Sequence, residues 1–167
     1  MFKKTVFGRL LYLFPVIFTV HNMEEVVSDL PGWSERAGLF HPIVGTFEFI
    51  FAVIVITILG YLFTYLAVKR GKGSIPAYLL FSLILVVDIN VFFPHLLATI
   101  ATKSLAPGTV SAVLLNLPIC TYLLIRGVKE EYIQLKRLLI ILIPFLIASI
   151  VTIAGLFFIG KTMEGLI

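Results

Sequence analysis

FGRLLYLFPVIFTVHNMEEV, residues 7–26, is the stretch that predicts the fold. Apart from Arg9, residues 7–20 are mainly apolar, which predicts a membrane-spanning helix. No small-x-small cleavage site follows, so we expect an uncleaved first span rather than a signal peptide. The span ends with His21, Glu24 and Glu25, which helical spacing places on one face. One imidazole and two carboxylates in this position suit a shared metal ion or a shared proton.

The composition is that of a helical membrane protein. Of the 167 residues, 60% are hydrophobic and only 13% are charged, and the mean hydropathy is +1.10, outside the range of soluble domains. The formal charge of +4 does not indicate a nucleic-acid partner, because the basic residues flank apolar spans instead of forming a stripe. The single cysteine, Cys120, excludes a disulfide within the chain.

Hydropathy predicts an all-α fold, a five-helix transmembrane bundle that forms one integral membrane domain over residues 1–167. The predicted spans are about 7–26, 42–68, 75–102, 109–125 and 138–160. Ten of the thirteen Lys and Arg residues fall in the N-terminal segment and in the loops 69–74 and 126–137. The positive-inside rule therefore predicts a cytoplasmic N-terminus and a C-terminus outside, with the plasma membrane as the expected location.

In this orientation the ionisable side chains of the spans gather in the outer half of the membrane. The histidines and carboxylates among them are the predicted metal ligands: His21, Glu24, Glu25, Glu48, Asp88 and His95. Asp88 lies near mid-membrane, and His95 follows seven residues later on the same helical face. Ionised carboxylates at a helix centre cost about 2.5–3.5 kcal/mol each, so they need protons, protonated histidine or a cation. We therefore expect a divalent metal ion, with zinc, iron or manganese as the candidates.

The motif His21-Asn22-Met23-Glu24-Glu25 and the five-span pattern resemble the HXXEE family of small integral membrane proteins. The segment from Asn90 to His95 is similar to a later polar block of that family. The resemblance covers most of the chain. It implies that His21, Glu24 and Glu25 are important, and it implies no particular reaction.

Three functions fit these observations. The leading hypothesis is a metal-dependent enzyme that acts on a membrane lipid or another apolar substrate, with Glu24, Glu25 and Asp88 as the predicted catalytic carboxylates. The second is a proton- or cation-coupled transport protein, in which Asp88 is the coupling site and a homo-oligomer is expected because the chain is short. The third is a structural scaffold whose polar groups only fix helix packing. The order of the helices around the bundle stays open.

Overall fold

The computed structural model describes residues 6–38 and 44–166. These residues are helical with connecting turns, and they contain no strand. Five helices are long and apolar enough to cross a membrane, which confirms the predicted all-helical, five-span class. They are Phe7–Val27, Thr46–Arg70, Ile75–Thr102, Thr109–Lys129 and Leu135–Glu164. The predicted start of the second span, Pro42, lies outside the described residues.

Several spans consist of more than one helical segment. In chain order the segments are α1 (Val6–Leu10), α2 (Leu13–Val27), α3 (Leu30–Ala37), α4 (Thr46–Arg70), α5 (Ile75–Asn90), the π-helix η1 (Val91–Leu96), α6 (Leu97–Thr102), α7 (Thr109–Ser111), the π-helix η2 (Ala112–Asn116), α8 (Leu117–Lys129) and α9 (Leu135–Glu164).

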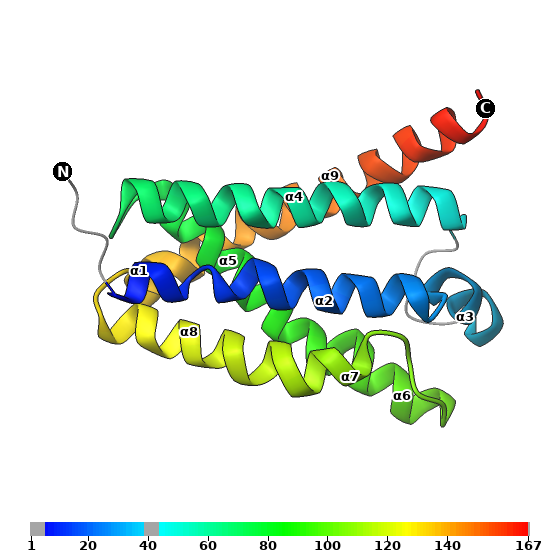
Figure 1. Ribbon diagram of the computed structural model, residues 1–167, viewed down its shortest axis with the longest axis horizontal. Coiled ribbons are helices and arrows are strands. Elements are labelled where there is room, and N and C mark those ends of the chain that lie inside the picture. The colour runs from blue at the N-terminus through cyan, green and yellow to red at the C-terminus, as the bar shows by residue number, and fades with distance from the viewer. Residues whose placement is uncertain (1–5, 39–43, 167) are drawn as a thin grey trace.

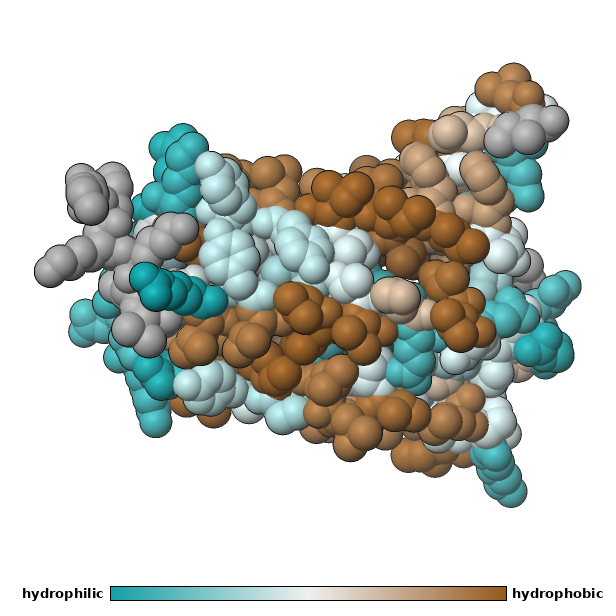
Figure 2. Space-filling view, in the orientation of Figure 1, coloured by the Kyte–Doolittle hydropathy of each residue, from teal (hydrophilic) through white to brown (hydrophobic). Residues whose placement is uncertain are grey.

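The spans run alternately up and down, as short connections between neighbouring helices require (Figure 1). Helix α5 is at the centre, because it packs against α4, α8 and α9. Helix α9 packs along α4 and α5, and its last turns extend away from the bundle (Figure 1). On the face shown in Figure 2, apolar side chains cover much of the middle of the molecule and the most hydrophilic residues lie at its two ends, the distribution that a bilayer requires.

Prolines explain the breaks in the first, third and fourth spans. A proline has no N–H, so the carbonyl four residues earlier loses its helical partner. Before Pro15 the helix is interrupted at Leu11 and Tyr12, and the Leu11 carbonyl accepts from the Phe14 N–H at 3.2 Å. The π-helices η1 and η2 lie at Pro94 and just before Pro118 in the same way.

The end of the bundle near the described N-terminus is closed by aromatic side chains. The ring of Phe7 lies 5.5 Å from that of Tyr132 and 6.5 Å from that of Phe81, centre to centre. The Tyr132 hydroxyl donates to the Ala67 carbonyl at 2.8 Å, and burial raises the pKa of Tyr132 to about 12, so the donor stays protonated. Gly127 allows this closure, because a Cβ there would lie 2.2 Å from the Phe81 ring. The polar side chains of the motif lie toward the opposite end.

Candidate functional site

Two histidines and one glutamate converge between the first and third spans. His21 and Glu25 lie one turn apart on α2, and His95 lies on η1. Glu25 Oε1 is 3.4 Å from His21 Nε2 and 3.3 Å from His95 Nε2. One ligand atom from each residue lies within 4.8 Å of the others, so the three could share a metal ion. Both histidines are buried, with exposed fractions of 2% and 3%.

The break in the third span directs His95 toward α2. Residue Phe93 has φ −134° and ψ 115°, which is not helical, so two helical parts of the third span meet at a kink here. A regular helix would place His95 on the face of Asp88, two turns away. In the structure the two side chains have different partners: His95 faces Glu25, and Asp88 accepts hydrogen bonds from the Thr121 hydroxyl at 3.2 and 3.3 Å.

The turn that begins the fourth span completes the surroundings of the cluster. Gly108 has φ +85° and lies against all three side chains, because a Cβ there would be 2.7 Å from His95, 2.8 Å from Glu25 and 3.0 Å from His21. The Ser111 hydroxyl donates to the Gly108 carbonyl at 3.3 Å and lies 3.0 Å from His21 Nδ1. In the tautomer in which the Nδ1–H of His21 donates to the Ser111 oxygen, Nε2 of this imidazole keeps its lone pair.

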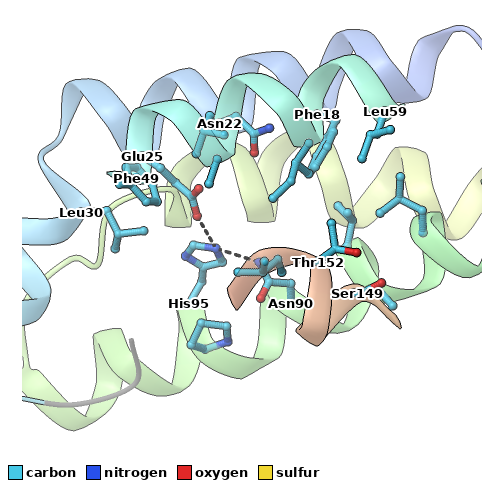
Figure 3. Close-up of a pocket in the computed structure, with 18 of the residues that line it drawn as sticks. Phe18, Asn22, Glu25, Leu30, Phe49, Leu59, Asn90, His95, Ser149 and Thr152 are labelled. Atoms are coloured by element: carbon cyan, nitrogen blue, oxygen red, sulfur yellow. Dashed lines mark hydrogen bonds and ion pairs between the residues drawn. The ribbon is translucent and has the colours of Figure 1, made fainter. Parts of the chain in front are cut away.

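The second histidine is oriented in a similar way. The Asn90 side-chain amide lies 3.2 Å from His95 Nε2, the same nitrogen that lies 3.3 Å from Glu25 Oε1 (Figure 3). The Nε2 atoms of the two imidazoles and one carboxylate oxygen therefore lie close together. A cation bound here would take the lone pair of His95 Nε2 in place of the Asn90 amide.

Three of the six predicted ligands, Glu24, Glu48 and Asp88, do not belong to the cluster that His21, Glu25 and His95 form among the described residues. Glu24 accepts from the backbone N–H of Val110 at 3.1 Å and of Ser111 at 2.7 Å, so its carboxylate sits at the N-terminus of the fourth span and ties α2 to it. Glu48 accepts from the Gly45 N–H at 3.3 Å and caps α4. Asp88 is bound to Thr121 as described above. His21, Glu25 and His95 are the predicted ligands that the structure brings together.

A cavity of about 450 Å³ opens beside the cluster, between α2, α4, α5 and α9. Glu25 and His95 line one part of it, together with the amide side chains of Asn22 and Asn90 (Figure 3). The Asn22 amide is held by its hydrogen bond to the Thr57 hydroxyl at 2.7 Å. Most of the remaining wall is apolar. This volume lies within the range of about 300–1,000 Å³ that is usual for small-molecule sites.

Sequence reasoning did not identify Gly108 or Ser111 as site residues. Gly108 belongs to a turn between two spans, and a glycine in such a turn gives no sign that three side chains pack against it. Ser111 resembles any hydroxyl residue of a membrane helix. Both became recognisable only when the fourth span was placed beside α2.

A third residue without an assigned role is Asn116, whose side chain is 1% exposed. Its amide nitrogen and oxygen have no hydrogen-bond partner among the described residues. Asn116 ends η2, one helical turn beyond Ser111, so this amide lies further along the same span as the residue that orients His21.

Comparison with known proteins agrees with the motif. Residues 12–123 match a family described as proteins of unknown function with an HXXEE motif. The chain is also 34% identical over 146 residues to the uncharacterized protein YrkK of Bacillus subtilis, an alignment that covers 87% of this chain and 92% of YrkK. No solved structure matches the chain.

Proposed function

We propose a function from the chemistry of the site, because the chain belongs to the HXXEE family, whose members are described only as proteins of unknown function. In this proposal the protein is a membrane-embedded, metal-dependent hydrolase that acts on a lipid or another apolar substrate. His21, Glu25 and His95 bind one divalent ion, and the cavity beside them holds the substrate.

The spacing of the ligand atoms is the observation that carries the proposal. Zinc with ligands at about 2.0–2.1 Å in a tetrahedron sets neighbouring ligand atoms about 3.3 Å apart. Two of the three distances between ligand atoms match this spacing, because Glu25 Oε1 lies 3.4 Å and 3.3 Å from the two Nε2 atoms, and all three atoms lie within 4.8 Å of one another. Two histidines and one glutamate leave one tetrahedral position open, as in catalytic rather than structural zinc sites. Glu25 and His95 line the cavity, so this position is accessible to a substrate there.

Charge balance also supports a metal ion. The ion pairs formed by Lys or Arg in the described part of the chain are Arg36 with Asp29 and Arg126 with Glu130, both away from the cluster. A divalent ion with one carboxylate and one bound hydroxide is neutral, which suits a site surrounded by apolar helices. Ser111 would hold His21 in the tautomer that binds metal through Nε2, the role usual for a group behind a histidine ligand.

The ion would lower the pKa of a bound water and supply a hydroxide at neutral pH. With the ion held by His21, Glu25 and His95, the oxygen of this water would add to an acyl carbonyl carbon of the substrate, and a C–O or C–N bond of the ester or amide would break. The proton released by the water passes to the leaving oxygen or nitrogen. Glu25 lines the cavity, so the carboxylate oxygen that does not hold the ion would transfer this proton.

The orientation of the site in the membrane is part of the proposal. Apart from Lys3 and Lys4, which lie outside the described residues, the basic clusters include Arg70, Lys72 and Arg137. The positive-inside rule puts these at the cytoplasmic side of a plasma membrane. The cluster lies toward the other end of the spans, so it would face the outer half of the membrane.

Proton-coupled binding is the second candidate, and Asp88 favours it. This carboxyl group lies within the third span, is half-buried, and has the Thr121 hydroxyl as its hydrogen-bond partner. Carboxyl groups at such depth often carry protons in transport proteins.

Elemental mass spectrometry of the purified protein tests the metal site. We expect about one zinc, iron or manganese ion per chain, and loss of this ion in Glu25→Gln and His95→Gln. The matched control is Glu24→Gln, the same chemical change at the neighbouring residue, which should keep the ion because Glu24 binds backbone N–H groups. A folded protein without metal, or equal loss in the control, would exclude the metalloenzyme and favour proton binding at Asp88.

A further inference from the structure

The cavity is long and follows the helix axes. Its wall includes Leu79 and Asn90 on α5, and Phe145 and Phe157 on α9. At 1.5 Å per residue these pairs are about 16–18 Å apart along their helices. One leaflet of a bilayer contributes half of a hydrocarbon core that is about 30 Å thick. The cavity is therefore about as long as a lipid chain in one leaflet.

The polar and apolar parts of the cavity are separated along this length. Its ionisable groups, Glu25 and His95, lie together with Asn22 and Asn90 toward one end (Figure 3). The far part is lined by Phe63, Leu79, Leu83 and Phe145. Ser149 lies between the polar end and the apolar far part of the cavity, but its hydroxyl already donates to the Phe145 carbonyl at 2.8 Å. A ligand with a polar end and a hydrocarbon chain complements this arrangement.

The charges at the polar end restrict the polar group of the ligand. The described residues that line the cavity include Glu25 and no Lys or Arg. Phosphate groups are bound mainly by Arg, Lys and free backbone N–H groups. The Asn22 and Asn90 amides, in contrast, are donors and acceptors suited to an uncharged ester or amide. The described wall offers a phosphodiester head group no Lys or Arg side chain, so the proposed ion would be its cationic partner there, beside the Glu25 carboxylate.

We infer that the ligand of this cavity is an uncharged single-chain lipid, a fatty acyl ester or amide, and not a phospholipid. Its carbonyl lies at Glu25 and His95, and its chain extends between α4, α5 and α9. The inference rests on the proposed function in one respect: the bound lipid is a substrate only if the cluster carries a reactive ion.

Photocrosslinking in nanodiscs tests this inference with two probes. One is a monoacylglycerol with a diazirine in its acyl chain, and the other is phosphatidylcholine with the same modified chain. We expect the monoacylglycerol to form adducts that peptide mass spectrometry maps to 79–87 and 145–153, and to be displaced by unmodified monoacylglycerol. Phosphatidylcholine should label only lipid-facing residues such as Leu114 and Ile140, which lie outside this cavity.

Two tryptophan variants make the mapping specific. Ala148→Trp fills the cavity, and Ile147→Trp adds the same ring at the adjacent residue, which is 61% exposed and does not line it. Adducts in the cavity should be lost in the first variant and kept in the second. Monoacylglycerol adducts confined to the lipid-facing surface, or equal cavity labelling by phosphatidylcholine, would overturn the inference.

The metal analysis separates the two proposals. Cavity adducts in a protein without metal would support the ligand class and exclude the hydrolase. Bound metal with no monoacylglycerol in the cavity would support the proposed metal site and overturn the proposed class of ligand.

Discussion

Gly108 lies where the backbone of the fourth span meets the side chains of His21, Glu25 and His95. Its φ of +85° is unfavourable for residues with a Cβ, and a Cβ would come within 2.7 Å of His95. Backbone strain of this kind costs about 1–3 kcal/mol. We therefore expect Gly108→Ala to displace the cluster, lower the unfolding temperature and reduce the bound metal, measured by thermal unfolding and elemental mass spectrometry.

Gly155→Ala is the matched control for this substitution. Gly155 is in α9, and a Cβ there would meet no atom within 4 Å. Alanine is the better helix former, so this variant should be as stable as the wild type or more stable. Full metal content in Gly108→Ala would show that the turn does not shape the cluster.

For individual residues, the sequence could predict only part of the site. His21 and Glu25 are four residues apart on one helix, so their proximity follows from helical geometry. Glu24 is also on this part of α2, but its carboxylate turns to the N–H groups of Val110 and Ser111. Which of two adjacent glutamates faces the histidines depends on how the helices are arranged, and one sequence does not contain that arrangement.

Among the elements, η1 determines where His95 points. Pro94 cannot donate to the Asn90 carbonyl, and the helix is kinked at Phe93, whose backbone is extended. Pro94→Ala would restore the missing donor and favour a regular helix, which turns His95 toward the face of Asp88. We expect this variant to stay folded and to lose metal. Circular dichroism and elemental mass spectrometry measure the two properties.

Pro144 is the matched control for this prediction. It lies inside α9, which continues without interruption from Leu135 to Glu164. Pro144→Ala should therefore leave the metal content unchanged. If both alanine variants kept their metal, the kink at Pro94 would not be what positions His95.

The element scale also explains why the spans were easier to predict than their faces. The length of an apolar stretch can be counted in the sequence, so the five long apolar helices were predicted correctly. The side of the helix on which a side chain lies depends on the conformation of every residue before it in that helix. Each π-helix changes that relation, as the separation of Asp88 from His95 shows.

For the whole molecule, the orientation in the membrane can be tested with cysteine labelling. In a Cys120→Ala background, Lys72→Cys and Lys103→Cys place one thiol at each end of the bundle, both at exposed positions. The positive-inside rule predicts that a membrane-impermeant maleimide added to intact cells labels only Lys103→Cys. Labelling of only Lys72→Cys would reverse the orientation and move the cluster to the cytoplasmic half of the membrane.

The position of α9 at the side of the cavity has a consequence for how the proposed site is divided along the chain. This helix supplies Phe145, Ser149 and Thr152 to the cavity wall, whereas the residues matched by the family description, 12–123, end before it begins. His21, Glu25 and His95 all lie within the matched part. In the proposed function the ion-binding residues therefore belong to the segment that the family description covers, and changes in α9 would alter part of the cavity wall without altering them.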